Sequence, residues 1–229
     1  MVDCDARLKP LFAGSFPEIK VVSSAAPGHE LDREFAAHLL CGSLPGLFRT
    51  SEDALAGTTS RCLVADPVAR EQLRNSYSDG RRLVGLARFT KNRRTGRTAL
   101  STFRFSPRSS RSLIFDALAC NYGDPNGLES QKVVAVAPLL IDRSVNPFAN
   151  IDIFAAQIAA MDLVVTIDNS KAHLADALGV PVFLLLPFAC DWRWLQARED
   201  SPWYPTLPPF RQPKLGKWQF VMQAVLNAL

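Results

Sequence analysis

Residues 151–187 read IDIFAAQIAAMDLVVTIDNSKAHLADALGVPVFLLLP, and this stretch decides the fold. Its apolar residues recur at helical spacing over 151–161 and 171–179. The two runs between and after them, 163–167 and 181–187, are almost wholly apolar, which is typical of strands buried on both faces. Helix, strand, helix and strand in this order predict a crossover unit in a parallel sheet, and therefore an α/β fold.

Strands and helices also alternate on both sides of this stretch. Proline at the first turn and glycine after the last turn mark the predicted helix ends at Pro67 and Gly179. The pattern predicts helices over 5–15, about ten residues from Pro67, and 218–229; strands at 19–23, 81–89, 113–120 and 133–141; an unassigned stretch at 30–48; and a long ordered loop over 191–213.

The composition is that of an ordinary globular chain, with 48% hydrophobic and 21% charged residues in 229. The apolar stretch Val180–Cys190 is much shorter than the roughly 20 residues that a membrane helix needs. Asp3 and Asp5 stand where a signal peptide has basic residues. These features predict a cytoplasmic protein without a membrane span.

The five cysteines are odd in number and widely spaced, with no Cys-x-x-Cys pair. Only three histidines are present that could share a metal site with them. We interpret the cysteines as reduced thiols and expect neither a disulfide framework nor a metal site.

Basic residues gather in one segment, 88–111, which holds eight of them and no acidic residue. Unopposed arginines with interleaved phenylalanines suit a nucleic-acid arm. The alternative is a solvated loop beside an anion-binding cleft, and we favour this second interpretation. A nucleic-acid partner is therefore not expected.

The turn Asp168-Asn169-Ser170-Lys171 lies between the carboxyl end of a predicted parallel strand and the start of a helix. Open α/β sheets bind ligands at this edge, and a helix amino terminus favours phosphate groups. Lys171 would add a mobile cation, and His173 a proton-transfer group one turn later. In the structural alternative, Asn169 or Ser170 only caps the helix and His173 packs as an ordinary helix residue.

Residues 142–229 resemble bacterial glycosyltransferases related to the family 9 heptosyltransferases, in particular those that follow tetratricopeptide repeats. The resemblance rests on motifs in a fixed order: DIFAAQIAAMD, DNSKAHL, LP, DWRW, SPWYP and FRQ. Looser similarity extends to ARLKPLFAGSFPEIKVV, GSLPGLF, CLVADP and CNYGD. The resemblance implies a GT-B fold, in which two Rossmann-like domains face each other across a cleft, and a metal-independent transfer that inverts the anomeric centre.

The resemblance also implies how the donor, a nucleotide-diphosphate sugar, is held. The turn residues match the family's segment for the donor diphosphate and ribose, and two departures occur: Ala87 replaces an aromatic residue before Arg88, and Asn121 replaces a glutamine. The implied donor-binding residues are Asp168, Asn169, Ser170, Lys171, His173, Arg88 and Asn121, with Asp191, Trp192 and Arg193 at the cleft rim. A stack of tryptophan and arginine that only fixes the terminal loop is an equal alternative for the last three.

Within this family's plan, we expect residues 1–64 to be the remnant of the acceptor-side domain and 65–229 to be the nucleotide-sugar-binding domain. The sequence offers no residue pair suited to general acid–base catalysis, so no catalytic residue is assigned. The chain is expected to be truncated at its amino end. The expected function is sugar transfer to an unidentified acceptor by the intact protein, without a cofactor; the alternative is a non-catalytic nucleotide-sugar-binding or interaction module.

Overall fold

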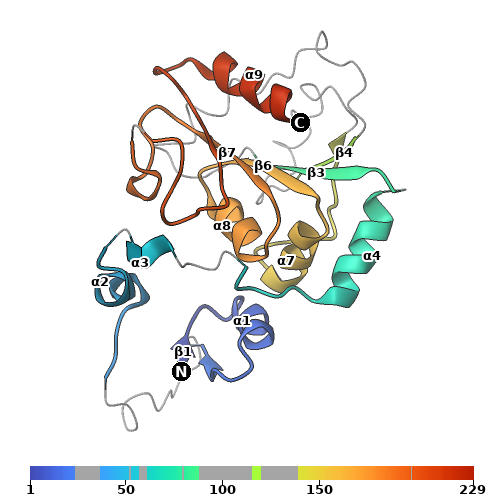
Figure 1. The fold of residues 1–229 in the computed structure, drawn as a ribbon. Coiled ribbons are helices and arrows are strands. Elements are labelled where there is room, and N and C mark those ends of the chain that lie inside the picture. The colour runs from blue at the N-terminus through green and yellow to red at the C-terminus, as the bar shows by residue number, and fades with distance from the viewer. Residues whose placement is uncertain are drawn as a thin grey trace.

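A six-stranded sheet with all its pairings parallel forms the centre of the protein (Figure 1). The computed structural model describes residues 1–23, 37–51, 53–56, 61–78, 80–87, 115–119, 139–196 and 198–229. The strand order is β5-β4-β3-β6-β7-β8. The strands are β3 (Arg82–Ala87), β4 (Phe115–Ala119), β5 (Leu139–Leu140), β6 (Leu163–Ile167), β7 (Val182–Leu186) and β8 (Pro209–Arg211). The predicted α/β class is confirmed.

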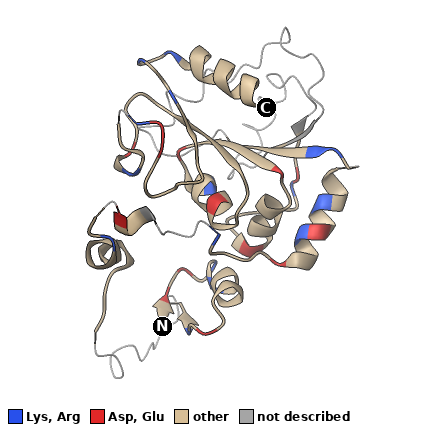
Figure 2. Ribbon diagram, in the orientation of Figure 1, with Lys and Arg blue, Asp and Glu red and all other residues tan. Residues whose placement is uncertain are grey.

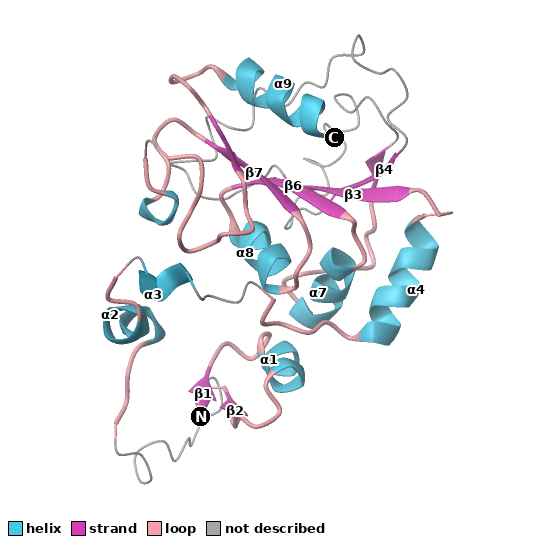
Figure 3. Ribbon diagram, in the orientation of Figure 1, coloured by secondary structure: helices cyan, strands magenta, loops and turns pink. Residues whose placement is uncertain are grey.

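Helices cover both faces of the sheet (Figure 3). On one face lie α4 (Pro67–Tyr77), α7 (Ile151–Ala159) and α8 (Ser170–Ala177), and on the other lies α9 (Trp218–Ala228). Alternate strand residues divide between two cores because successive side chains point to opposite faces. The α7 and α8 face includes Leu83, Val164 and Leu184, and the α9 face includes Val84, Val165, Leu185, Trp218, Val221 and Val225.

The helix ends follow the capping residues in the sequence. Asp66 accepts a hydrogen bond from the amide of Ala69 ahead of α4, and Asn150 accepts from the amides of the first turn of α7. Gly179 follows α8 with φ +75°, and a Cβ there would lie 2.9 Å from Cδ of Arg61. Both the backbone conformation and the close approach of Arg61 therefore favour glycine at this position.

The amino-terminal segment adds short elements beside this sheet: β1 (Val2–Asp3), α1 (Lys9–Ser15), β2 (Val21–Val22), η1 (Cys41–Ser43), α2 (Leu44–Phe48) and α3 (Asp53–Ala56). Strands β1 and β2 pair in parallel with each other. Leu11 of α1 is buried in the core on the α7 side, and Ser15 Oγ accepts a hydrogen bond from the amide of Val64. The division at residue 64 stays a prediction.

Two predicted segments differ from the structure. The expected loop over 191–213 contains a short 3-10 helix, η3 (Trp192–Trp194), and strand β8, which pairs with β7. A loop was predicted because prolines flank and begin this strand. Proline is nevertheless tolerated in a strand at the edge of a sheet, which is where β8 lies. Of the predicted strand 133–141, residues 133–138 lie outside the described part of the chain, and β5 follows them.

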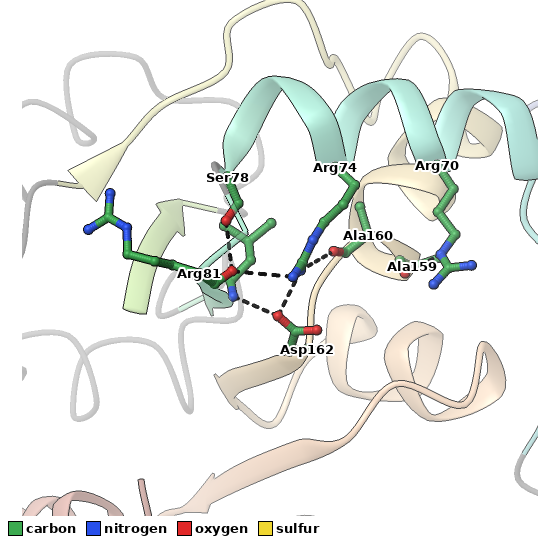
Figure 4. A network of polar contacts seen from close by, with 8 residues as sticks. Arg70, Arg74, Ser78, Arg81, Ala159, Ala160 and Asp162 are labelled. Atoms are coloured by element: carbon green, nitrogen blue, oxygen red, sulfur yellow. Dashed lines mark hydrogen bonds and ion pairs between the residues drawn. The ribbon is translucent and has the colours of Figure 1, made fainter. Parts of the chain in front are cut away.

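A polar network fixes the amino ends of β3 and β6 (Figure 4). The guanidinium of Arg74 on α4 donates to the carboxylate of Asp162 at 2.7 Å and to the carbonyl of Ala160 at 2.9 Å. The same carboxylate accepts the amide of Leu83 at 2.7 Å. Arg70 donates to the carbonyl of Ala159, so α4 is tied to the carboxyl end of α7 as well.

Helix α4 contains charged residues of both signs, whereas β6 and β7 contain none (Figure 2). Among the described residues, no helix combines the length and the apolar character that crossing a membrane requires.

Candidate functional site

The strand order reverses between β3 and β6. From β3 the chain continues outward to β4 and β5, and then returns to place β6 on the other side of β3. Ala87 at the end of β3 pairs with Thr166 near the end of β6. Ligands of open α/β sheets bind at such a reversal. Asp168 and Asn169 follow β6 directly, and Arg88 follows β3 in the sequence.

Asn169 is the N-cap of α8, as the structural interpretation of the turn predicts. Its Oδ1 accepts the amide of Lys171 at 2.9 Å, and its backbone carbonyl accepts the amide of Ala172 at 3.1 Å. Because the capping bond uses Oδ1, the side-chain nitrogen Nδ2 takes no part in the cap. It is buried and has no hydrogen-bond partner among the described residues. This amide therefore carries two N–H donors that no described residue accepts.

Thr166 joins this cap to the neighbouring strand, and sequence reasoning missed it. Its hydroxyl oxygen lies 2.8 Å from the carbonyl oxygen of Ala87 and 3.2 Å from Oδ1 of Asn169. The side chain is fully buried. A polar residue in the otherwise apolar run LVVTI is the signal that could have revealed it, because a buried hydroxyl needs partners.

Lys171 is buried, with 1% of its surface exposed, so the expectation of a mobile cation is wrong. Lys171, Ala172, Ala175 and Asp176 are the buried residues of α8 and share one side of the helix. Lysine was expected at the surface because its charge is costly to bury. Ser170, the first residue of α8, is exposed.

His173 packs in an aromatic cluster with Trp194 and Tyr204. Its ring stacks on Trp194 with centroids 5.6 Å apart and planes at 10°, and it lies 5.2 Å from the ring of Tyr204. Burial lowers the pKa of His173, while the nearby charge of Asp168 opposes this shift. Its Nδ1 is buried without a hydrogen-bond partner among the described residues. Sequence reasoning did not assign Tyr204 to the site.

The segment after β7 forms a second part of the site. Asp191 pairs with Arg193 at 2.8 Å, and the guanidinium of Arg193 lies 4.7 Å from the ring centroid of Trp192. This is the predicted stack of tryptophan and arginine, yet Trp192 remains 60% exposed. The charges of Asp168, Asp191 and Arg193 all act on the pKa of Tyr204, which burial raises. The stack of His173 on Trp194 brings the start of α8 and the rim after β7 close together.

The structure thus brings together the turn residues 168–171, His173, and the rim residues 191–193. Arg88 and Asn121 lie outside the described part of the chain. Within the described ranges, no group of three or more His, Cys, Asp or Glu residues could hold a metal ion.

The lowered pKa of His173 predicts a pH-dependent stability. The folded protein keeps this imidazole neutral at a pH where the unfolded chain, with a pKa near 6.5, already binds a proton. The unfolded state then binds more protons, so the free energy of unfolding falls as the pH drops below that value. We expect His173→Gln to reduce this fall, measured by urea unfolding at about pH 7.5 and about pH 5.5. The exposed His38 provides the control, since His38→Gln should keep the wild-type dependence.

The fold resembles that of a GT-B type glycosyltransferase. The solved structure of ADP-heptose lps heptosyltransferase II from E. coli matches 72% of this chain with a TM-score of 0.50 at 17% identity, and the match covers 51% of that chain. A glycosyl transferase family 9 structure from Veillonella parvula matches 86% of this chain and 53% of its own, with a TM-score of 0.48 at 15% identity. This chain therefore spans about half the length of the heptosyltransferase. No family model matches it.

Sequence comparison finds a curated relative as well. Protein FlbA from Caulobacter vibrioides is 40% identical over 81 residues, which is 35% of this chain and 13% of FlbA.

Proposed function

We propose that this protein binds a nucleotide-diphosphate sugar at the carboxyl ends of β3 and β6 and belongs to a glycosyltransferase that moves the sugar to an acceptor. The observation that carries the proposal is the position of the turn Asp168-Asn169 at the strand-order reversal, directly before α8. The fold neighbour described above is an ADP-heptose heptosyltransferase, which supports a donor of this class.

The turn offers three features that suit a diphosphate. The positive end of the α8 dipole attracts anions. The unused Nδ2 donors of Asn169 can bind a phosphate oxygen. Ser170 adds an exposed hydroxyl. Asp168 is available for a sugar or ribose hydroxyl, as a carboxylate accepts hydrogen bonds.

The proposed reaction proceeds by stabilisation of the leaving group. When the bond between the sugar and the diphosphate breaks, negative charge grows on the nucleotide diphosphate. The helix end and Asn169 would stabilise this charge without a metal. In the proposed single displacement, an acceptor hydroxyl forms the new glycosidic bond from the opposite face of the sugar and gives its proton to a base, so the anomeric centre is inverted. Arg88 and Asn121, which follow β3 and β4 in the sequence, are proposed as further donor contacts. The acceptor and the catalytic base are not assigned.

A substitution at Asn169 separates ligand binding from helix capping. A carboxylate also caps a helix, so Asn169→Asp should keep α8 intact while it removes the Nδ2 donors and places a negative charge beside the diphosphate. We expect the free energy of binding of the nucleotide-diphosphate sugar to become less favourable by about 1.5–3 kcal/mol. Isothermal titration calorimetry with ADP-, UDP- and GDP-sugars measures this change.

The equivalent cap of α7 supplies the matched control. Asn150→Asp makes the same chemical change at the cap of α7, which follows the outermost strand β5 and not a strand at the reversal, so it should leave the affinity unchanged. Equal affinities of wild type and Asn169→Asp would count against the proposed site. Release of free nucleoside diphosphate in the presence of cell extract would distinguish a transferase from a module that only binds.

A further inference from the structure

The exposed Trp192 and the half-buried Trp203 form an aromatic corner in the segment after β7. Their ring centroids are 5.6 Å apart, and their planes are nearly perpendicular, at 88°. Trp192 is 60% exposed, although an indole is among the side chains that gain most from burial. A large aromatic surface that remains in water next to a ligand site is a candidate binding surface.

Contacts within the chain hold this corner in place. The guanidinium of Arg193 lies 4.7 Å from the ring centroid of Trp192 and is held by Asp191 at 2.8 Å. Ser201 Oγ donates to the backbone carbonyl of Arg193 at 3.0 Å, which ties the segment of Trp203 to η3. Because these contacts order the rings before any ligand arrives, binding to them loses little conformational entropy.

Ionised groups border the corner and remain accessible. The side chains of Asp191 and Arg193 are 35% and 43% exposed. One is a hydrogen-bond acceptor and the other is a donor. The corner therefore combines an apolar ring face with polar groups of both kinds at its edge.

The corner is also near the turn after β6. Asp168, Asp191 and Arg193 all act electrostatically on His173, which lies one turn after the cap of α8. His173 stacks on Trp194, the last residue of the 3-10 helix that begins with Trp192. The stacking of these two rings therefore joins the helix that follows the turn to the 3-10 helix that carries Trp192.

We propose that Trp192 and Trp203 bind the sugar ring of the nucleotide-sugar donor, with Asp191 and Arg193 hydrogen-bonded to its hydroxyls. A sugar ring has apolar C–H faces, which pack on an indole, and hydroxyls around its rim, which need polar partners. A chair-shaped ring is thick enough to touch the face of one indole and the edge of the other. A flat base stacked on Trp192 would use only the face. The inference rests on the proposed function for the position of the diphosphate.

Calorimetry with paired ligands tests this assignment on the full chain. The pairs are ADP with ADP-glucose, UDP with UDP-glucose, and GDP with GDP-mannose, and the pair that the wild type binds is used for the variants. Trp192→Ala should weaken the nucleotide sugar about tenfold and leave the affinity for the nucleoside diphosphate unchanged. Trp192→Phe should restore part of the lost affinity, because it retains an aromatic face. Phe220→Ala, at a 59% exposed aromatic residue of α9, is the control and should change neither affinity.

Each other outcome overturns the inference in a different way. If Trp192→Ala weakened the binding of the nucleoside diphosphate and of the nucleotide sugar equally, the indole would contact the base and not the sugar. Unchanged affinities would show that the corner does not contact the donor. Wild-type protein that binds none of the six ligands would reject the proposed function, and this inference with it. Thermal unfolding of Trp192→Ala checks that the variant is folded, as expected for an exposed side chain.

Discussion

Trp194→Ala is expected to lower the free energy of unfolding by about 3–5 kcal/mol. Trp194 is fully buried, and its ring contacts both His173 on α8 and Tyr204 in the terminal segment. Alanine would leave a cavity where three parts of the structure meet, and the surrounding backbone can fill it only in part. Urea unfolding followed by circular dichroism measures the loss.

Trp192→Ala is the matched control for this prediction. Trp192 is two residues away in the same 3-10 helix but is mostly exposed. Its removal should cost less than about 1 kcal/mol, because surface substitutions leave no cavity. Similar losses for the two variants would contradict the packing described for the terminal segment.

Arg211→Met should be the second most destabilising change, at about 2–4 kcal/mol. The guanidinium of Arg211 on β8 donates to the backbone carbonyls of Trp194 and Leu195. It also lies 3.5 Å from the sulfur of Cys190. Methionine keeps much of the side-chain volume but removes every donor, so the carbonyls of Trp194 and Leu195 lose their bonds from Arg211 and the terminal segment loosens. Denaturant unfolding gives the magnitude, and limited proteolysis should show earlier cleavage in the segment after β7.

Arg198→Met tests whether the loss depends on the position of the arginine. Arg198 lies in the same segment and pairs with Asp200 at 2.7 Å, where the carboxylate is largely exposed. Exposed ion pairs contribute little, so we expect a loss below about 1 kcal/mol. If Arg198→Met were as destabilising as Arg211→Met, the backbone contacts of Arg211 would not explain its effect.

The sequence predicted most of the sheet because its strands are buried on both faces. LVVTI and VFLLL contain no charge, and each borders a helix with a recognisable cap or terminal glycine. Residues at the ends of parallel strands gather at one edge whatever the details of packing. For this reason the turn after β6 and the rim after β7 were predicted together. Their roles in donor binding stay predictions.

The missed features depend on tertiary contacts that have no local pattern. Strand β8 is short and begins with proline, so only its pairing with β7 makes it a strand. Lys171 is buried because it lies on the side of α8 that faces the core. Its charge alone predicted an exposed side chain. Thr166 and Tyr204 contact residues far away in the sequence, and such contacts arise only once the sheet has assembled.

The network around Arg74 and Asp162 separates the two ends of the strands by function. It clamps the edge where the strands begin, while the proposed chemistry belongs to the edge where they finish. Natural variation around Arg74 should therefore change how long the protein survives in the cell, whereas variation around Asn169 should change what it recognises. Stability and ligand recognition can then evolve with little effect on each other, because they depend on residues at opposite ends of the strands.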